Sequence, residues 1–279
     1  MKQLKLRKTV SIFIFFIFTN VSFSQIHNYD GTEIDTLVFF NTRKALNSLS
    51  TEKFRKEIFK NDTDEMRYRI LFPKDFTFKE KYPLVITFHN STRIGNDNEN
   101  QLEPLARIWL REDIYSRFKC FVLAPQFREL SSYYIKNEES FSVSKPSKAV
   151  FTLLSIISRI EKQYPNIDKG RIYLVGYSMG GSTAQNLMSI EPNKFAALIS
   201  IAAVPDFSNI DKIKSKNIWL IHGMKDEDNP YSGSEELYKR LDGDRNLRFT
   251  TFTKLNHNNI TIPFLETEEV PKWLFTKSK

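Results

Sequence analysis

Cysteine is nearly absent from this sequence: Cys120 is the single thiol among 279 residues, so no disulfide can form within the chain. Cys120 lies in an apolar run, residues 120–124, and this context predicts a buried thiol that packs as a small hydrophobic side chain. The sequence also lacks H-E-x-x-H and the paired His or Cys spacings that hold metals. It contains no internal repeat and no low-complexity run. We therefore expect neither a metal site nor a disordered, collagen-like or coiled-coil chain.

The positive charge of the chain is not gathered into a basic patch. Lysine and arginine number 41 against 33 acidic residues, which gives a formal net charge of +8. Residues 1–24 contain four of the basic residues and no acid, so the remainder carries +4 (8 − 4). Proteins that bind nucleic acids show a basic stripe with interleaved aromatic residues or a known recognition motif. Neither feature is present, and we expect no nucleic-acid partner.

Residues 1–24 have the three parts of a secretory signal peptide. A basic stretch at residues 2–8 precedes an apolar run at 10–18, and Ser22 and Ser24 stand at the small-residue positions before a cleavage site. The apolar run is shorter than the roughly 20 residues that a membrane-spanning helix needs. We therefore predict cleavage after Ser24 and a secreted or periplasmic protein without a stable membrane anchor. An uncleaved anchor is the alternative.

The remaining length suits one large α/β domain better than two small ones. With 41% hydrophobic and 14% aromatic residues, the sequence can bury a sizeable core. Residues 25–60 are predicted to form an N-terminal accessory segment, in which residues 51–59 have helical spacing of their apolar positions. The main domain then covers residues 61–279.

Short apolar runs alternate with helical patterns along this main domain. The predicted strands are residues 66–72, 83–88, 120–124, 171–175, 197–203, 217–221 and 247–253. The predicted helices are residues 146–164, 179–190 and 232–241, with Ser234 expected as the N-cap of the last. Runs that are apolar on both faces are typical of buried parallel strands. The alternation predicts a mainly parallel, doubly wound α/β sheet with helices on both faces, and sites in such sheets form at the carboxyl ends of the strands.

The most specific motif follows the predicted strand 171–175. Residues 176–180 read Gly-Tyr-Ser-Met-Gly, a G-x-S-x-G sequence between a strand and a helix, which is the context of a nucleophile elbow. Gly176 and Gly180 supply the small residues that this sharp turn needs on either side of the serine. The turn would lift the Ser178 hydroxyl above the sheet, beside helix N–H groups that can stabilise an oxyanion. Ser178 is therefore the predicted nucleophile.

A serine nucleophile needs a base, because its hydroxyl is a poor nucleophile near neutral pH. In hydrolases with this elbow the chain order is serine, acid, histidine. Of the four histidines, His257 fits this order, and it lies in a polar loop after the last predicted strand. His222 is predicted to be a strand-end histidine that packs or hydrogen-bonds locally.

Three carboxylates follow late strands and are candidates for the acid: Asp206, Asp226 and Asp228. Asp226 comes after the strand 217–221, and a buried carboxylate there would hold the tautomer of the His257 ring and stabilise the imidazolium. Asp228, two residues further on, fits a turn residue. We predict Asp226 as the acid and keep Asp206 as the alternative, because the chain order allows it too.

The oxyanion hole and the substrate contacts are expected in neighbouring loops. The backbone N–H groups of Met179, after the nucleophile, and of Ser91, after the strand 83–88, are the candidates for the oxyanion hole. Tyr177 beside the nucleophile is a candidate substrate contact. Tyr133 and Tyr134 are two more, since they lie in a long connection that leaves a carboxyl strand end, and long loops are often functional.

With these motifs in place, the sequence resembles the single-domain α/β-hydrolases labelled predicted peptidases, close to polyhydroxybutyrate-depolymerase-type esterases and to feruloyl or acetyl-xylan esterases. It also resembles the catalytic domain of the prolyl oligopeptidase group. The resemblance rests on residues 82–89, 124–126, 167–181 and 222–226 and extends over roughly residues 66–260. By position it implies Ser178 as nucleophile, Asp226 as acid and His257 as base, with no cofactor.

One position departs from the pattern of that family. Asn90 stands where the family usually has a glycine after the histidine. Asparagine tolerates left-handed geometry better than most residues with a side chain. Its side chain would nevertheless add bulk and polarity near the oxyanion hole, with an effect on rate and substrate range.

The sequence therefore predicts an α/β-hydrolase catalytic domain at residues 61–279 that cleaves carboxylic esters through an acyl-enzyme intermediate. The expected substrate is a small or medium ester, such as one carried by a carbohydrate. Two alternatives stay open. One is a serine peptidase of the prolyl-oligopeptidase type, whose gating domain does not fit in this length; the other is a catalytically silent hydrolase fold used for binding.

Overall fold

The computed structural model describes residues 25–241 and 246–279, so the predicted signal peptide at residues 1–24 lies outside the described residues. Within these ranges the strands are β1 (Ile26–Asp30), β2 (Phe54–Lys60), β3 (Glu65–Leu71), β4 (Tyr82–Phe88), β5 (Phe121–Gln126), β6 (Ser132–Lys136), β7 (Ser142–Pro146), β8 (Ile167–Tyr177), β9 (Ala197–Ile201), β10 (Asn217–Gly223) and β11 (Leu247–Phe252). The helices are α1 (Thr36–Asn47), η1 (Ser91–Arg93), α2 (Pro104–Arg107), η2 (Ile108–Leu110), α3 (Glu112–Arg117), α4 (Lys148–Gln163), α5 (Met179–Ile190), α6 (Ile210–Ile213), α7 (Tyr231–Arg240), α8 (Ile262–Leu265) and α9 (Glu269–Phe275). None of the described helices is long and apolar enough to cross a bilayer.

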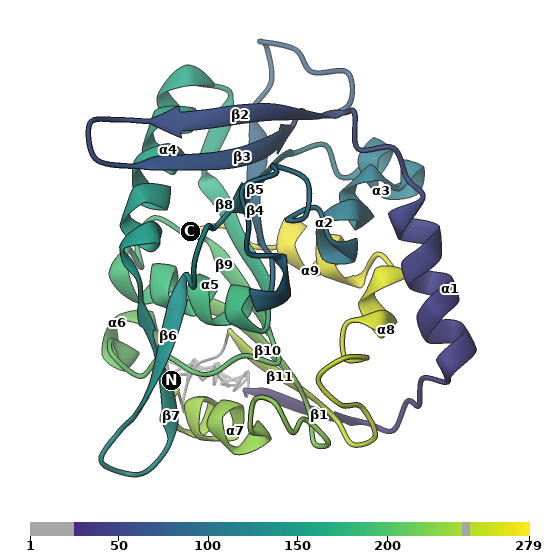
Figure 1. Cartoon of the computed structure of the whole chain (residues 1–279), viewed down its shortest axis with the longest axis vertical. Coiled ribbons are helices and arrows are strands. Elements are labelled where there is room, and N and C mark those ends of the chain that lie inside the picture. Colours follow the sequence, from purple (N-terminus) through teal and green to yellow (C-terminus); the bar gives the residue numbers. More distant parts are fainter. Residues whose placement is uncertain (1–24, 242–245) are drawn as a thin grey trace, which may run out of the picture.

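A mainly parallel sheet runs through the centre of the molecule (Figure 1). In the described part of the chain it has nine strands, in the order β1-β11-β10-β9-β8-β4-β5-β3-β2. Neighbours pair in parallel except that β3 runs antiparallel to both β2 and β5. From β4 the chain adds β5 on one side and later β8 on the other, so the order in which strands are added reverses between β4 and β8. Ligands usually bind at the carboxyl ends of the strands at such a point. The predicted strands correspond to β3, β4, β5, β8, β9, β10 and β11, and the predicted fold class is confirmed.

Two hydrophobic cores hold helices against the two faces of this sheet. Successive residues of a strand point to opposite faces, and β8 divides its side chains in this way. Ile172 and Leu174 pack in one cluster with residues of α4, α5 and α7, whereas Tyr173 and Val175 pack in the other with residues of α1, α2, α8 and α9. All four side chains are fully buried. Burial of each such side chain contributes about 1.5–3 kcal/mol, so the central strand is anchored from both sides.

Residues 25–60, predicted as an accessory segment, are built into the same sheet. β1 pairs with β11 at one edge and β2 pairs with β3 at the other, while α1 contacts α2 and α8. The helix predicted at residues 51–59 is wrong, because residues 54–60 form β2. Phe54 and Phe59 are five positions apart, an odd spacing that places them on opposite faces of this edge strand. They are accordingly buried in the two different cores.

The connection after β5, predicted as a long loop, contains a β-hairpin instead. β6 and β7 pair antiparallel, from Ser132 opposite Pro146 to Lys136 opposite Ser142. Ser132 Oγ donates to Asn186 Oδ1 at 2.7 Å, which ties the hairpin to α5. The tyrosines and isoleucine of β6 favour an extended strand. This hairpin therefore stands beside the carboxyl edge of the sheet rather than as an irregular loop.

Cys120 precedes β5 and is buried, as its apolar surroundings predict. Burial raises the pKa of the Cys120 thiol. Because the thiolate is the reactive form of cysteine, this residue belongs to the core and not to the chemistry of the site.

Candidate active site

Ser178 lies where β8 ends and α5 begins, at the carboxyl edge of the sheet. Its backbone has φ 57° and ψ −124°, a conformation that costs about 1–3 kcal/mol and that is concentrated at functional sites. The Ser178 N–H donates to the carbonyl of Ile201 at the end of β9 (2.9 Å), which ties the turn to the sheet. A Cβ at Gly176 would stand 2.1 Å from the carbonyl oxygen of Gly180, so the turn closes only with glycine there. The strand, turn and helix of the predicted elbow are all present.

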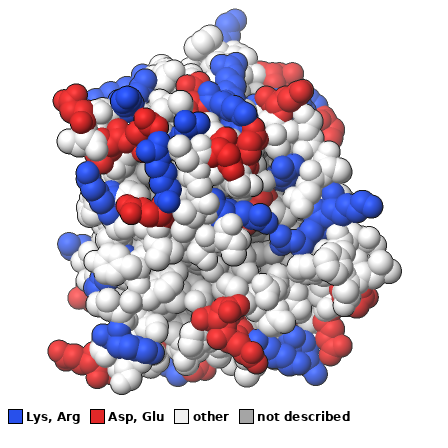
Figure 2. Space-filling view, viewed as in Figure 1, with Lys and Arg blue, Asp and Glu red and all other residues white. Residues whose placement is uncertain are grey.

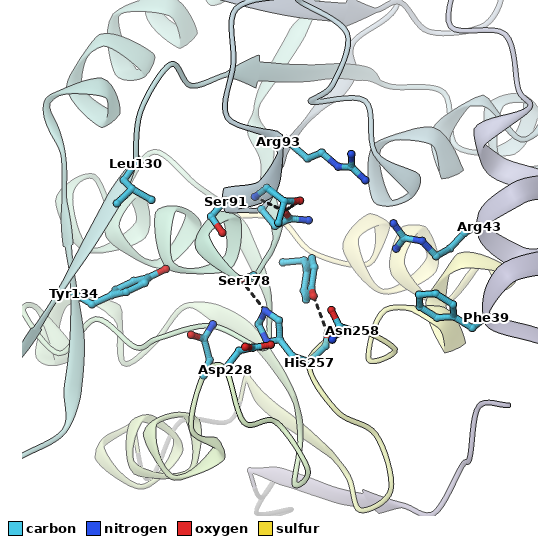
Figure 3. A pocket seen from close by; sticks show the side chains of 14 residues that line it. Phe39, Arg43, Ser91, Arg93, Leu130, Tyr134, Ser178, Asp228, His257 and Asn258 are labelled. Atoms are coloured by element: carbon cyan, nitrogen blue, oxygen red, sulfur yellow. Dashed lines mark hydrogen bonds between the residues drawn. The ribbon is translucent and has the colours of Figure 1, made fainter. Parts of the chain in front are cut away.

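Three side chains at this edge form a continuous chain of hydrogen bonds. Ser178 Oγ lies 2.9 Å from His257 Nε2 (Figure 3). On the other side of the ring, His257 Nδ1 lies 2.8 Å from Asp226 Oδ2. All three residues are buried. An ionised carboxylate can only accept, so the hydrogen bonds assign the proton to His257 Nδ1 and leave Nε2 to accept from the Ser178 hydroxyl. In this geometry the imidazole can take a proton from the serine.

Asp226 accepts four hydrogen bonds after the end of β10. Its Oδ2 accepts from His257 and also from His222, at 3.1 Å. Its Oδ1 accepts from the backbone N–H groups of Asp228 and Asn229, at 3.0 and 2.8 Å. Burial raises the pKa of this carboxyl, but the hydrogen bonds from the two histidines and the backbone outweigh it and hold the pKa well below its usual range. Asp226 is therefore ionised at neutral pH.

His222 is a partner of the acid that the sequence did not assign. Its ring is fully buried, with Nδ1 2.7 Å from Ser234 Oγ and Nε2 2.9 Å from the carbonyl of Asn229. Because the carbonyl and the Asp226 carboxylate only accept, Nε2 carries the proton and Nδ1 accepts from Ser234. The expectation that Ser234 caps a helix is wrong, since α7 already begins at Tyr231. One feature of the sequence could have pointed to this contact: His222 lies at the end of β10, four residues before Asp226.

The loop that carries His257 is held against the segment that carries the acid. A Cβ at Gly223 would stand 2.3 Å from the carbonyl oxygen of Leu255, so glycine lets the two segments touch. The Lys225 N–H donates to the same carbonyl at 3.1 Å. Tyr177, predicted as a substrate contact, donates its hydroxyl to the carbonyl of His257 at 2.8 Å and also lines the cavity described below. It therefore positions the histidine loop as well.

The other two candidate acids have different surroundings. Asp206 is buried after β9, where its carboxylate accepts from Asn186 Nδ2 at 2.9 Å and from Ser208. Asp228 is exposed at the cavity, and its backbone N–H donates to Asp226 Oδ1. Of the three candidates, Asp226 is the one whose carboxylate hydrogen-bonds to the histidine.

One grouping of the described residues has metal-ligand spacing. Ligand atoms of Asp226, Asp228 and His257 lie within 4.8 Å of one another. The acid and the histidine, however, already share a 2.8 Å hydrogen bond between Oδ2 and Nδ1. A metal ion in this place would have to replace that bond, so the residues present fit a proton relay better than a metal site.

Two free N–H groups lie at the elbow and at the loop after β4. Within residues 25–241 and 246–279, the backbone N–H groups of Ser91 and Met179 have no acceptor. Met179 is the first residue of α5, and N–H groups in the first turn of a helix have no partner within the helix. Ser91 lines the same cavity as Ser178. Unpaired donors so placed can stabilise an oxyanion next to the nucleophile.

Asn90 does not adopt the left-handed geometry that asparagine tolerates and that a glycine at this position could take. Its φ of −78° and ψ of 174° are extended backbone. Its Oδ1 caps η1 by accepting from the Thr92 N–H at 2.8 Å, and its Nδ2 donates to Glu103 Oε2 at 2.7 Å. The side chain is thus tied into the protein, and the asparagine fixes the loop that carries Ser91.

Two buried side chains, His89 and Glu103, hydrogen-bond to Asn90 and so support the loop that carries Ser91. His89 Nε2 accepts from the Phe127 N–H (3.0 Å), so Nδ1 carries the proton and donates to the carbonyl of Asn90 (2.8 Å). Burial lowers the pKa of His89 to about 4, which keeps the ring neutral. Glu103 accepts from both nitrogens of Asn90, and burial raises the pKa of Glu103 to about 7, against the opposing effect of Arg93. The loop therefore rests on one neutral histidine and one carboxyl that titrates near neutral pH.

The raised pKa of Glu103 predicts a contribution to stability that falls as pH rises. Between the ordinary value of 4.5 and about 7 the folded state keeps a proton that the unfolded state has lost, so unfolding becomes easier with rising pH over this window. Glu103→Gln, which does not titrate, should gain stability relative to the wild type between about pH 5 and about pH 8. Urea unfolding of both proteins at the two pH values measures this difference. A difference that does not change with pH would contradict the prediction.

Ser178 opens onto a cavity of about 530 Å³, within the range of roughly 300–1,000 Å³ that is usual for small-molecule sites. The lining residues are Phe39, Arg43, Asn90, Ser91, Thr92, Arg93, Leu130, Tyr134, Tyr177, Ser178, Asp228, Asn229, His257 and Asn258. Figure 2 shows this face hollowed near its centre, with basic side chains above and to the right of the hollow and acidic ones below it. Tyr134 points toward the cavity (Figure 3), whereas Tyr133 is not among the lining residues. The two tyrosines are neighbours on β6, and neighbours on a strand face opposite sides.

Because Tyr134 lines the cavity and Tyr133 does not, a substitution of Tyr133 serves as the control for the same substitution of Tyr134. Tyr134→Ala should raise KM for an ester with an aromatic group by about tenfold, because an aromatic contact and its buried area are lost. Tyr133→Ala removes the same side chain from the opposite face of the same strand and should leave the kinetics unchanged. Steady-state kinetics across an ester series measures both variants. Equal effects of the two substitutions would remove Tyr134 from the substrate site.

Comparison with known sequences agrees with this fold. The family described as alpha/beta hydrolase fold matches residues 141–230. A bifunctional acetylxylan esterase/xylanase from Neocallimastix patriciarum is 32% identical over 104 residues, which are 37% of this chain and 15% of that protein. The chain thus spans a small part of this curated relative.

Solved structures extend the comparison to most of the chain. A thermostable esterase matches with a TM-score of 0.74 and 32% identity, over 82% of this chain and 64% of that one. A ferulic acid esterase matches with a TM-score of 0.59 and 15% identity, over 80% and 98% of the two chains. An acylaminoacyl peptidase from Pyrococcus horikoshii matches with a TM-score of 0.57 and 14% identity, over 88% and 44%. The last two likenesses concern the fold alone.

Sheet order and comparisons together show that the chain has the α/β-hydrolase fold. Two of the proteins to which it is similar at 32% identity are named as esterases.

Proposed function

We propose that this chain is a secreted serine esterase in which Ser178 is the nucleophile, His257 the general base and acid, and Asp226 the acid of the triad. The hydrogen-bond chain from Ser178 Oγ through His257 to Asp226 is the observation that carries the proposal. The positive φ of the serine and the cavity in front of it support the same assignment.

Acylation would begin with attack of Ser178 Oγ on the ester carbonyl carbon, while the hydroxyl proton moves to His257 Nε2. The carbonyl oxygen becomes an oxyanion, which accepts hydrogen bonds from the backbone N–H groups of Ser91 and Met179. The ionised Asp226 stabilises the imidazolium and keeps its ring in place. When the intermediate collapses, the alcohol leaves with the proton from Nε2, and the acyl group remains bound to the serine oxygen.

Deacylation would repeat these steps with water as the nucleophile. His257 Nε2 takes a proton from the water as its oxygen attacks the acyl carbon, and the same N–H groups stabilise the second oxyanion. The bond to Ser178 Oγ then breaks, and the serine takes back the proton from Nε2. The products are a carboxylic acid and the unchanged enzyme, so neither a metal nor an organic cofactor enters the cycle.

The proposed substrate is a small or medium ester, and a carbohydrate-borne ester is the preferred class. The relatives with this fold include a protein named for acetylxylan ester cleavage and one named for ferulic acid esters. A cavity of about 530 Å³ has room for an acyl or aryl group and part of a sugar. The aromatic ring of Tyr134 at its edge suits stacking on either group.

A fluorophosphonate probe together with a panel of esters and peptides tests the proposal. We expect covalent labelling of the wild-type protein at Ser178 and turnover of acetyl and aryl esters. Turnover of peptides without turnover of esters would favour a peptidase. A folded protein that takes no label and hydrolyses neither class would be a hydrolase fold used for binding.

Export is proposed from residues 1–24, which have the composition of a signal peptide. The protein recovered from the periplasm or medium should then begin at Gln25, and its intact mass measures this directly. A membrane-bound species that still carries Met1 would contradict cleavage.

A further inference from the structure

Two arginines from distant parts of the chain line the cavity on the same side. Arg43 comes from α1, within the N-terminal segment, and Arg93 from η1, two residues after Ser91. Figure 3 shows both guanidinium groups at the rim away from Tyr134 and Leu130, with Ser178 between the two sides. The cavity therefore has one aromatic and aliphatic side and one cationic side.

Neither guanidinium is neutralised by an ion pair within the part of the chain that the structure describes. No carboxylate lies within salt-bridge distance of Arg43 or Arg93 among residues 25–241 and 246–279. The Nε atom of Arg93 is buried and has no hydrogen-bond partner there. Protein atoms enclose this Nε, so a ligand in the cavity is met by the terminal nitrogens of the two guanidinium groups, which stay charged and have no carboxylate partner there.

Both arginines act to lower the pKa of the nearby Glu103 carboxyl, but this carboxyl is a salt-bridge partner of neither of them within the described residues. Its two carboxyl oxygens already accept from Asn90. Its pKa is raised to about 7 because it is buried, despite the opposing effect of both arginines. At neutral pH this single carboxyl therefore cannot balance two guanidinium groups, and the cationic side keeps a net positive charge.

We infer that this site prefers esters that carry a carboxylate, with the carboxylate held by Arg43 and Arg93 while the ester carbonyl lies at Ser178. The inference rests on the proposed serine esterase function and adds the substrate class. Arginine is suited to the task because its planar guanidinium donates two parallel hydrogen bonds to a carboxylate and stays charged. Phe39, one turn before Arg43 on α1, adds an apolar wall next to the carboxylate.

Matched pairs of esters separate the charge from the shape of the substrate. On the alcohol side, 4-carboxyphenyl acetate is compared with the nearly isosteric, neutral 4-carbamoylphenyl acetate. On the acyl side, the mono-4-nitrophenyl ester of terephthalic acid is compared with the same ester of terephthalic acid monoamide. The rigid ring prevents the carboxylate from attacking its own ester. The pair that shows a preference tells which half of the substrate faces the arginines.

Three variants test the contacts against this background: Arg43→Gln, Arg93→Gln and the control Lys44→Gln. Lys44 is the exposed neighbour of Arg43 on α1 and is not a lining residue, so its loss changes the net charge equally without touching the cavity. Each arginine variant should lower kcat/KM for the carboxylate ester by about tenfold or more relative to its amide partner, the usual effect of losing a hydrogen bond between charged groups. Arg43→Lys should restore part of the loss. Lys44→Gln should leave the ratio unchanged, and added salt should weaken the preference in the wild type.

The outcomes separate this inference from the proposed function. Equal kcat/KM changes for the carboxylate and amide partners, or the same change in Lys44→Gln, would overturn the inference while ester turnover stands. If Ser178 takes no fluorophosphonate and no ester is cleaved, the proposed function fails. Calorimetric binding of 4-hydroxybenzoate against 4-hydroxybenzamide still decides on the arginines in that case. Binding of the acid that requires Arg43 and Arg93 supports a carboxylate site, and equal binding of both compounds contradicts it.

Discussion

Ser178→Ala should abolish ester turnover, with kcat lower by about 10⁴- to 10⁶-fold, and should leave the fold intact. The substitution removes the oxygen that attacks the carbonyl, while the backbone that supports it is unchanged. The side chain of Ser178 hydrogen-bonds to His257, and the turn is held by its backbone N–H to Ile201. Alanine meets the same backbone strain at φ 57° as serine does, so the elbow should keep its shape.

Initial rates with 4-nitrophenyl acetate, fluorophosphonate labelling and a thermal melt measure the three consequences. Ser189→Ala is a suitable control, since Ser189 lies on α5, the helix that follows Ser178, and its buried hydroxyl has no partner within the described residues. The control should keep both label and activity. A folded Ser178→Ala protein that hydrolyses esters at the wild-type rate would show that another residue is the nucleophile.

The strands and the elbow could be predicted because both are written in short segments of sequence. Buried parallel strands are apolar on both faces, and their carboxyl ends meet at one edge of the sheet. Ser178, Asp226 and His257 each follow such a strand, so their order in the chain was enough to propose that they meet. The structure places the His257 ring 2.9 Å from Ser178 Oγ and 2.8 Å from Asp226 Oδ2.

Elements whose form depends on distant partners could not be predicted. β2 was expected to be helical, because Phe54 and Ile58 are four residues apart, which is a helical spacing. In the structure, Phe54 and Phe59 are instead buried in two separate cores on opposite faces of the strand. Residues 126–145 were expected to be a long loop, but they contain a hairpin in which Ser132 and Ser144 are buried and hydrogen-bond to Asn186 of α5. In both cases tertiary packing decides the secondary structure, and local pattern does not contain that information.

The residues that position the catalytic side chains and line the cavity could not be predicted from the sequence either. From the sequence, Asn90 was compared with glycine only for the backbone conformations that it allows. Its role instead comes from its side chain, which donates to Glu103, thirteen residues away, and caps η1. His222 was read as a local strand-end residue, yet it donates to the oxygen of Asp226 that also accepts from His257. Arg43 gave no signal at all, because α1 reaches the cavity only through the packing of the N-terminal segment. Side chains that act through another residue leave no motif.

The surroundings of Asp226 predict how its loss should act. In Asp226→Asn the oxygen that accepts from the backbone of Asp228 and Asn229 can remain an amide oxygen. The amide NH2 group then faces His257 Nδ1, in the position where the carboxylate oxygen accepts now. A donor at this place forces Nδ1 to accept, which moves the ring proton to Nε2. The imidazole can then no longer take the proton of Ser178, and kcat should fall by about 10⁴-fold if the site behaves as the best-studied triad does.

His222 makes the same substitution costly in a second way. Its Nε2 carries a proton that is now shared between the Asp226 carboxylate and the carbonyl of Asn229. Opposite an amide NH2 group this proton keeps only the carbonyl as acceptor, so a small loss of stability should accompany the loss of rate. Asp226→Asn should still fold, because the backbone hydrogen bonds of the segment do not need the charge. Circular dichroism and urea unfolding measure this part of the prediction.

The control variants for the acid are the two carboxylates that the chain order also allowed. Asp228→Asn changes an exposed side chain at the cavity and should lower kcat far less than Asp226→Asn does. Asp206→Asn disturbs the hydrogen bonds with Asn186 and Ser208, so we expect a loss of stability with kcat of the folded fraction near wild type. The folded fraction from circular dichroism, which does not depend on the reactivity of Ser178, corrects each rate for folded protein. If Asp206→Asn proved to be the crippling change and Asp226→Asn stayed near wild type, the acid would belong to the strand before, and the hydrogen bond between Asp226 and His257 would have another purpose.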